Sequence, residues 1–525
     1  MRRREFISRS AAYSLLPMLI GGFTVKAFGR SPLLESLVAA ATETDRVLVL
    51  IQLNGGNDGL NTVIPLSEYT NLSKARAGIL IPEAKVLKLT DATGLHPSLS
   101  GLADLYANGR LAIVQSVGYP NPSYSHFRAT DIWLTASDAN QNLSSGWMGR
   151  YLNEEYPQFP DAYPNTVMPD PLAIQIGSSI SPGLQGPEVS MGMTITDPTK
   201  FYQLVTGMVD PAPNTPAGHE LTFIRQVSQQ TQQYAAVIKN AASKAANLST
   251  RYPSSPDHTL GDQLKVVARL IAGGLKTRIY VVTLGGFDTH SNQVVAGATE
   301  TGTHATLLGR LSKAIAAFQD DLALLKVDHR VVGMTFSEFG RRILSNASGG
   351  TDHGSAAPLI VFGKGINAGI IGSNPIIPST VTAANNLPMQ YDFRSVYASI
   401  LRDWFGVPQQ ELESVLLRGF QSLPIIAAPT GVGRTAITPD SVTLRQNYPN
   451  PFNPSTRLQF TVADGPVQIK LFNSAGQEVM TIREGSYPAG THEVWVDGSS
   501  LSSGVYYCRL QQGAEVRTIM MTLIR

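Results

Sequence analysis

The chain has 525 residues, of which 43% are hydrophobic and 15% charged, so it is long enough for more than one domain with a sizeable core. Its formal net charge of +2 at pH 7 gives no electrostatic argument for a nucleic-acid partner or a strongly acidic one. The single cysteine, Cys508, excludes an internal disulfide framework and a cysteine-based zinc site.

Residues 1–41 have the pattern of an export signal. Clustered arginines are followed by an apolar run that is too short and too often interrupted by Gly and Pro for a comfortable membrane span. Residues 3–7, RREFI, resemble the twin-arginine export motif, in which two arginines precede an apolar pair. A Sec signal or an uncleaved anchor is the alternative, and cleavage near Ala27 or within residues 39–41 fits equally well. We expect no transmembrane span after removal of the signal.

From about residue 46, short apolar runs alternate with helical patterns. Helices are predicted at 219–247, 261–274 and 304–325, where apolar residues recur at helical spacing or the composition is rich in Gln, Ala and Lys. Near-continuous apolar runs are typical of strands covered on both faces, as in a parallel sheet. Such strands are predicted at residues 46–53, 111–117, 278–284, 330–336 and 358–363. The alternation predicts a doubly wound, mostly parallel α/β domain over 45–425, with ligands at the carboxyl ends of its strands.

The composition changes at residues 426–440, where small residues and prolines predict a linker. Residues 441–525 then contain four runs in which apolar and polar residues alternate, with turn signals between them: LQFTV, VQIKLFN, HEVWVDG and GVYYCRLQQG. This pattern predicts a small antiparallel β-sandwich as a second domain.

Five polar stretches of the first domain are candidates for chemistry, and four of them sit at strand ends. They are LNGGNDGLNTVIP (53–65), NPSYSHFRATDIW (121–133), GGFDTHSNQ (285–293), TFSEFGRR (335–342) and GGTDHGSAAPLIVFGKGI (349–366), the last of which precedes its strand. In the third stretch, Asp288 and His290 are two residues apart, so in an extended segment both side chains lie on one side. A carboxylate oxygen and an imidazole nitrogen placed in this way can bind one divalent ion, whereas a solvated turn is the alternative.

The first two stretches each allow two interpretations. Asp58 follows two glycines that let the backbone approach a ligand closely, and it is either an oxygen ligand or a turn former. Ser125 either caps the helix that it enters or acts as a nucleophile at the positive helix end, with His126 and Arg128 close by.

The remaining candidates are a carboxylate and two histidines. Glu338 ends an apolar strand, where a carboxylate is costly unless it binds a metal or pairs with Arg341 or Arg342. His353 lies in a loop, where a lone histidine is usually exposed and idle. The sequence leaves open whether His304 joins the site or only begins its helix.

Taken together in this order, NGGNDGLNT, NPSYSHF, GGFDTH, SEFGRR and GTDHGSAAPLIVFGKGI resemble the bacterial family called domain of unknown function 1501, of the alkaline phosphatase and sulfatase superfamily. The helix predicted over residues 391–407 resembles a late helix of that superfamily. The resemblance implies one or two divalent metals at strand ends and attack on a phosphate or sulfate ester by Ser, Thr or a modified Cys.

Residue by residue, the resemblance implies the following roles. Asp58 matches the first-strand metal carboxylate, and Ser125 stands where the nucleophile enters its helix. One metal site is matched by Asp288, His290 and His353. Glu338 stands at the second site, where Phe339 replaces a histidine ligand, so the first site is expected to be intact and the second impaired.

The tail resembles the C-terminal sorting domain of type IX secretion cargo, an FlgD-like immunoglobulin fold. The resemblance is carried by the basic final residue, Arg525, and by LRQNYPNPFNP (444–454), LFNSAGQEV (471–479) and YPAGTHEVWVDGSSLSSGVYYCRL (487–510). It implies passage through the periplasm to the cell surface or the medium, with the export and type IX secretion machinery as partners and no catalysis in this domain.

The sequence therefore predicts an exported, metal-dependent hydrolase acting on phosphate or sulfate esters, with Ser125 and His126 catalytic. The metal ligands would be Asp58, Asp288, His290, Glu338 and His353, holding zinc, calcium or magnesium. A small molecule or a glycan ester would be the substrate. The alternative is a non-catalytic surface protein that keeps a degenerate phosphatase-like scaffold, and adhesion through the sandwich is a third possibility.

Overall fold

The computed structural model describes residues 18–20, 23–25, 45–198, 215, 234–254, 259–427, 442–447, 450–463, 465–487, 490–513 and 515–524. The twin-arginine motif, most of the predicted signal, nearly all of the predicted linker and part of the predicted helix at 219–247 lie outside these residues. Within the signal, β1 (Met18–Ile20) and β2 (Phe23–Val25) pair as antiparallel strands. The chain divides into two compact units, Met1–Ala428 and Pro429–Arg525.

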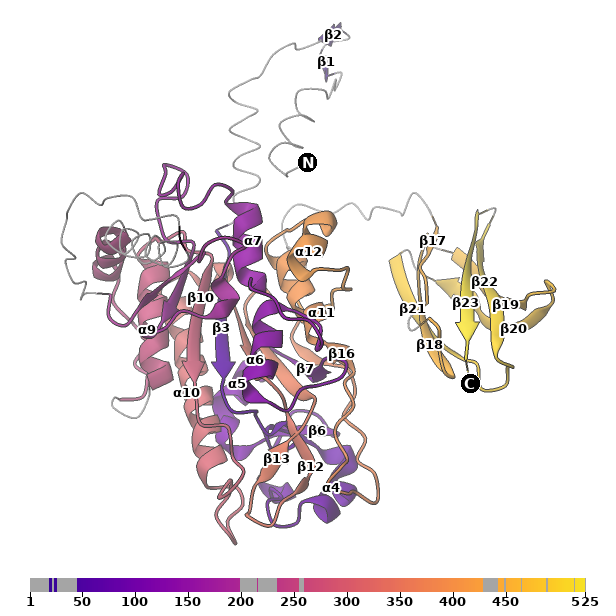
Figure 1. The fold of residues 1–525 in the computed structure, drawn as a ribbon, viewed down its shortest axis with the longest axis horizontal. Helices are drawn as coiled ribbons and strands as arrows, with labels where there is room; N and C mark the ends of the chain where they lie inside the picture. Colours follow the sequence, from indigo (N-terminus) through magenta and orange to yellow (C-terminus); the bar gives the residue numbers. More distant parts are fainter. Residues whose placement is uncertain are drawn as a thin grey trace. The chain divides into compact units, whose positions relative to one another are not determined.

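The described part of the first unit is built around a nine-stranded sheet (Figure 1). The strand order is β15 (Gly369–Ile371), β7 (Leu111–Gly118), β14 (Ala357–Gly363), β11 (Val331–Phe336), β3 (Val47–Leu53), β10 (Ile279–Leu284), β8 (Ala173–Ile176) and β9 (Met193–Ile195), with β16 (Tyr391–Asp392) also paired with β7. All pairs are parallel except those that β14 makes with β11 and β7. The mostly parallel α/β fold predicted from the apolar runs is confirmed.

Alternate side chains of the central strands enter two separate cores. In β3, Leu48 and Leu50 lie in one core, while Val47, Val49 and Ile51 lie in the other. The period of two along a strand explains this division, and burial on both faces explains why the run is apolar throughout. The domain thus has three layers, with the sheet in the middle.

Two layers of helices cover the faces of the sheet (Figure 1). One layer contains α6 (His126–Thr135), α7 (Trp147–Glu155), α11 (Phe393–Ser399), the π-helical turn Ile400–Trp404 and α12 (Gln409–Leu416). The other contains α5 (Ser100–Ala107), the helical residues 234–244, α9 (Thr259–Ala272) and α10 (Thr303–Leu324). Among the described residues, none of the helices combines the length and the apolar character needed to cross a bilayer.

Smaller elements pack at the end of the sheet where β3, β10 and β11 finish. They include α3 (Gly59–Thr62), α4 (Tyr69–Ala75), the hairpin of β12 (Arg341–Ser345) and β13 (Thr351–His353), and a three-stranded sheet of β4 (Val63–Pro65), β6 (Thr93–Leu95) and β5 (Leu87–Lys88). Single 3-10 turns lie at Leu66–Glu68, Glu83–Lys85, Pro97–Leu99, Pro182–Leu184 and Asp328–Arg330. A further apolar cluster that includes Leu60, Leu72 and Ile343 joins α3, α4 and the hairpin.

The second unit, taken by itself, consists of two antiparallel sheets. One contains β17 (Thr443–Leu444), β18 (Ser455–Val462) and β21 (Gly490–Asp497), and the other contains β20 (Glu478–Tyr487), β19 (Gly465–Asn473), β22 (Gly504–Gln512) and β23 (Glu515–Leu523). Inward side chains from both sheets, with Cys508 among them, form one core. The small β-sandwich predicted from alternating residues is confirmed.

Truncation of a core leucine should destabilise the α/β unit far more than truncation of an exposed leucine on the same helix. Leu308 is fully buried in α10, whereas Leu324 near the end of that helix is 49% exposed. We expect Leu308→Ala to lower the free energy of unfolding by about 2–5 kcal/mol. Leu324→Ala should change it by no more than about 0.5 kcal/mol. Chemical denaturation of the full chain measures both, and equal effects would contradict the assignment of α10 to the core.

Candidate metal centre

Strand direction brings five polar segments to one edge of the sheet, among them the segment after β7, which like β11 runs antiparallel to β14. Strands β3, β10 and β11 are parallel, so their carboxyl ends share that edge. Strand β14 runs antiparallel to β11, so the segment that precedes it arrives at the edge where its parallel neighbours end. Asp288 follows β10, Glu338 follows β11, and His353 ends β13 just before β14. This explains why the fifth polar stretch precedes its strand while others follow theirs.

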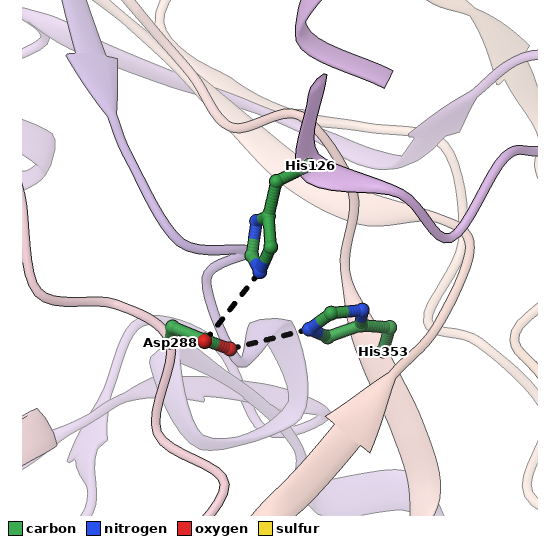
Figure 2. Close-up of side chains that lie close together, drawn as sticks. All are labelled: His126, Asp288 and His353. Carbon is green, nitrogen blue, oxygen red and sulfur yellow. Dashed lines mark hydrogen bonds and ion pairs between the residues drawn. The ribbon is translucent and has the colours of Figure 1, made fainter. Parts of the chain in front are cut away.

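Three side chains at this edge, His126, Asp288 and His353, form a group (Figure 2). Each offers one nitrogen or oxygen atom, and these three atoms all lie within 4.8 Å of one another. The His126 Nε2 atom is 3.5 Å from Asp288 Oδ2, and His353 Nε2 is 3.2 Å from Asp288 Oδ1. His126 is the first residue of α6, Asp288 lies in the loop after β10, and His353 ends β13 of the hairpin. The group therefore brings together a helix, a loop and a hairpin. Two imidazoles and a carboxylate are suitable ligands for a divalent ion.

His290 lies against the same group. Its Nε2 atom is 2.8 Å from His353 Nε2 and 3.2 Å from Asp288 Oδ1. The structure therefore brings together the three residues predicted to hold one metal, and it adds His126, which the sequence analysis placed among the catalytic groups.

The hydrogen bonds on the far side of each ring determine where its proton lies. The Nδ1 atom of His353 is 2.7 Å from the carbonyl oxygen of Tyr124, which only accepts hydrogen bonds, so this nitrogen carries the proton. The Nδ1 atoms of His126 and His290 likewise face carboxylates, at 2.7 Å from Glu338 Oε1 and 3.2 Å from Asp352 Oδ1. In the neutral rings this leaves all three Nε2 lone pairs directed towards Asp288.

Such an arrangement is electrostatically unfavourable by itself. Two unprotonated nitrogens 2.8 Å apart, both close to a carboxylate, have no hydrogen to share. Either an extra proton or a cation between them removes the repulsion. An outer hydrogen bond that fixes the tautomer of a histidine and directs its other nitrogen inward is the usual support of a metal ligand. The donor set therefore fits a divalent metal.

Asp288 is also held by a buried guanidinium. Arg341 donates from Nη2 to Asp288 Oδ1 at 2.6 Å and is only 1% exposed. Partial burial raises the pKa of Asp288, but the hydrogen bond and charge of Arg341 outweigh it, and with His353 and His290 they lower the pKa from 3.8 to about 2. For the histidine, burial lowers the pKa of His353 despite its bonds to Tyr124 and Asp288. Both shifts favour an ionised carboxylate beside a neutral imidazole.

A glycine makes the close approach of two loops possible. Gly55, directly after β3, has a φ of +120°, and a Cβ atom built on it would lie 2.2 Å from the backbone nitrogen of Asp288. No side chain fits that space, so the loop after β3 packs directly against the loop after β10 that carries Asp288. The backbone N–H of Gly55 also donates to Glu338 Oε1 at 2.8 Å.

Glu338 and Phe339 lie behind the imidazoles. Glu338 is 2% exposed, and one of its oxygens accepts both from Gly55 and from His126, so the carboxylate orients His126. The ion pair between Glu338 and Arg341 that the sequence offered as an alternative is not made, since Arg341 pairs with Asp288. The ring of Phe339 packs against those of His126 and His353, with centroid distances of 4.9 and 4.5 Å. It limits the movement of both imidazoles.

Ser125 occupies the N-cap position of α6, but its hydroxyl makes no capping hydrogen bond. The capping function that offered the simplest explanation of this serine is therefore absent. Ser125 is exposed and directly precedes His126, whose ring lies in the group.

Asp58 lies outside this group. It is fully buried, and its carboxylate accepts from Arg76 at 2.9 and 3.0 Å and from Gln293 Nε2 at 2.6 Å. Burial raises the pKa of Asp58, but Arg76, His304 and Gln293 together lower it. These partners satisfy its charge. Asp58, which the family resemblance implies to be a metal ligand, is thus bonded to Arg76 and Gln293 in this structure.

His304 is equally buried, and its Nε2 atom donates to Asn57 Oδ1 at 3.0 Å. Burial lowers the pKa of His304 to about 4, so the ring is neutral at pH 7. It stands beside the network of Asp58 and is not one of the three grouped residues.

Several contributors were missed by the sequence analysis. Arg341 was considered only as a partner of Glu338, and Gln293 was quoted within GGFDTHSNQ without a role. The only signal for either was a polar residue in a strand-end segment. The carbonyl oxygen of Tyr124 gives no signal at all, because every residue has one.

Comparison with known families agrees with this architecture. Residues 45–416 match the family described as "Protein of unknown function (DUF1501)". The chain belongs to this family. Residues 446–524 match the secretion system C-terminal sorting domain, so this DUF1501 protein is exported to the cell surface or secreted. None of the curated proteins matches the chain.

Solved structures give more distant similarities. A sulfatase from a Pseudoalteromonas species is 12% identical, with 90% of this chain and 89% of that chain covered and a TM-score of 0.33. A phosphonate monoester hydrolase from Silicibacter pomeroyi is 9% identical, with 91% and 89% covered and a TM-score of 0.30. Structures this distant establish no activity for the DUF1501 protein.

A surface component of the type-IX secretion system of Porphyromonas gingivalis is 19% identical over 19% of this chain, with a TM-score of 0.12. This chain spans only 14% of that protein.

The low pKa of Asp288 predicts a specific acid sensitivity. A carboxylate whose folded pKa is below its unfolded value stabilises the fold above the unfolded pKa, and this contribution is lost as the pH falls through the folded pKa. We therefore expect Asp288→Asn to remove part of the stability loss between pH 3.8 and about 2. Denaturation of the metal-free protein across this range measures the effect. The exposed Asp91→Asn is the control, and an acid profile unchanged by Asp288→Asn would contradict the ion pair with Arg341.

Deletion of residues 441–525 tests the sorting domain. The α/β unit has its own two cores, so the shortened chain should fold and still leave the cytoplasm, but it should accumulate in the periplasm instead of reaching the surface or the medium. Cell fractionation measures its distribution. Delivery to the surface at the level of the full chain would show that the tail is dispensable for sorting.

Proposed function

We propose that this DUF1501 protein is an exported, metal-dependent hydrolase of phosphate or sulfate esters, with a small molecule or a glycan ester as substrate. The observation that carries the proposal is the convergence of His126, Asp288 and His353, with the exposed Ser125 directly before His126 in the chain. His290 would complete the ligand set, since its Nε2 atom lies 3.2 Å from Asp288 Oδ1. In this assignment, His126 is a ligand rather than a catalytic base, and Asp58 and Glu338 are not ligands.

The donor set favours a transition metal. Three imidazole nitrogens and one carboxylate oxygen suit zinc or a similar ion, whereas calcium and magnesium prefer a shell of oxygens. We therefore narrow the expected metal to zinc or a related divalent transition ion. When bound, such an ion supplies charge stabilisation at an ester oxygen and lowers the pKa of an adjacent hydroxyl or water.

Residues of the chain would supply the nucleophile, orient the His126 ring and balance the charge of Asp288. Ser125 stands at the N-terminus of α6, where the helix dipole favours negative charge, and its hydroxyl is not used as a cap. It is the proposed nucleophile: its oxygen would bond to the phosphorus or sulfur atom while the alcohol of the ester leaves, and water would then release the phosphate or sulfate from the serine. Glu338 fixes the orientation of His126, and Arg341 balances the charge of Asp288.

A non-catalytic surface protein with one structural ion is the second candidate. It is favoured by the engagement of Asp58 with Arg76 and of Glu338 with His126, which leaves neither carboxylate available for a second metal. A clamp of two metals on attacking and leaving oxygens is therefore not part of the proposal.

Metal analysis and an ester panel distinguish these candidates. We expect the purified full chain to bind one zinc-type ion, for which the Nε2 atoms of the three histidines and the Asp288 carboxylate would be the ligands, and to cleave aryl phosphate or aryl sulfate. His353→Ala should lose the ion and the activity, whereas the exposed His329→Ala should retain both. Ser125→Ala should retain the ion but lose activity by at least about 10³-fold.

Elemental analysis and initial-rate measurements give both readouts. A folded wild-type chain that binds one ion and cleaves no ester in a broad panel would support the non-catalytic candidate. A chain that binds no divalent ion would exclude both candidates as stated.

A further inference from the structure

A buried glutamine connects the two segments that carry the proposed ligands. Gln293 has no exposed surface, and its Oε1 atom accepts from Thr289 Oγ1 at 3.1 Å and from Thr351 Oγ1 at 2.9 Å. Thr289 lies between Asp288 and His290, and Thr351 is two residues before His353. One side-chain oxygen therefore binds the loop after β10 and the β12–β13 hairpin at once.

The other end of the amide is fixed by Asp58. Gln293 Nε2 donates to Asp58 Oδ2 at 2.6 Å, so the carboxylate determines which way the amide faces. Asp58 is in turn held by Arg76, which also donates to the carbonyl oxygens of Ile343 at 3.0 Å and Arg342 at 2.7 Å. These hydrogen bonds form a chain. It links Arg76 at the end of α4 to Asp58 in the loop after β3, and Arg76 also binds strand β12 of the hairpin.

Only an amide satisfies all of these partners. Two hydroxyls need an acceptor and a carboxylate needs a donor, and Gln supplies both from one planar group. A carboxylate at position 293 would face Asp58 with like charge, and a hydrocarbon would leave two buried hydroxyls without an acceptor. The backbone N–H of Thr351 also donates to the carbonyl oxygen of Thr289 at 3.2 Å, so the side-chain bridge runs alongside a direct backbone contact.

We propose that Gln293, oriented by Asp58 and Arg76, is a positioning residue that sets the register between the loop after β10 and the β12–β13 hairpin. It thereby fixes the distances among Asp288, His290 and His353. Asp58, expected from the family resemblance to bind metal, acts in this account through Gln293 and not as a ligand. The metal-binding consequence rests on the proposed function, whereas the effect on loop register does not.

The first test compares two buried glutamines changed in the same way. Gln293→Met removes the bridge, and Gln319→Met, in the buried part of α10, is the matched control. With cobalt(II) as probe, we expect Gln293→Met to weaken binding by about 10–100-fold and to alter the visible spectrum of the bound ion. Gln319→Met should leave both unchanged. Equal cobalt affinity and equal spectra for wild type and Gln293→Met would overturn the proposal.

A double substitution tests whether Gln293 acts through the threonine. If it does, Thr351→Val should weaken cobalt binding in the wild-type background and add little in the Gln293→Met background. Fully additive losses would show that Gln293 does not act through Thr351 and would contradict the bridge.

Hydrogen exchange of the metal-free protein separates this proposal from the proposed function. We expect faster exchange at the backbone amides of residues 288–290 and 351–353 in Gln293→Met, and no change there in Gln319→Met. If the wild type binds no cobalt but this local increase is present, the hydrolase proposal fails and the positioning role stands. If the exchange of these amides is unchanged, the positioning role fails whatever the protein binds.

Discussion

The arrangement of the loops at this edge of the sheet depends on one buried arginine side chain. The guanidinium of Arg341 is enclosed at the carboxyl ends of the strands, where an arginine is tolerated only if its donors are satisfied. It bonds the carboxylate of Asp288 and backbone carbonyl oxygens from three segments, those of Gly55, Gly56, Phe287 and Thr351. Gly55 and Gly56 follow β3, Phe287 follows β10, and Thr351 lies in β13. Arg341 is therefore satisfied only when all three meet, and their meeting brings the candidate ligands together.

Strand direction supplies the second constraint. A fully parallel sheet would place the segment before β14 at the opposite edge, far from Asp288. Because β14 runs antiparallel to β11 and β7, the hairpin with His353 joins the edge where β3, β10 and β11 end. The same reversal places the carbonyl oxygen of Tyr124, in the segment after β7, 2.7 Å from His353 Nδ1. The topology and the orientation of one imidazole thus have a common cause.

Much of this architecture could be predicted from the sequence, and the reason is periodicity. Apolar runs identified five central strands, and alternating residues identified the sandwich, because burial on two faces or on one leaves these patterns directly in the sequence. The residues around Asp288 could be predicted as a site because they follow or precede strands and because they match family motifs. The partners of Asp58 and Arg341 could not be predicted, because a buried carboxylate has the same sequence signal whether it faces an arginine or a metal. Arg76 lies outside all five polar stretches of the first domain.

A fold of this kind separates the tasks of its polar residues. Arg341 and the Asp58 network hold the loops, and Glu338 and the Tyr124 carbonyl orient two of the imidazoles. Asp288 and the three imidazoles direct their carboxylate oxygens and Nε2 atoms towards one another. The sorting tail directs the protein out of the cell. The site needs no cysteine ligand, in agreement with a chain whose one cysteine is buried in the sandwich.

The central claim is that His126, His290 and His353 each keep their proton on Nδ1 and direct an unprotonated Nε2 at one point beside Asp288. Nitrogen-15 NMR of the ring nitrogens measures this directly at neutral pH, before and after zinc is added. The account predicts Nδ1–H tautomers in all three rings and a zinc-dependent shift of all three Nε2 signals. Nε2–H tautomers, or Nε2 signals that do not respond to zinc, would contradict it.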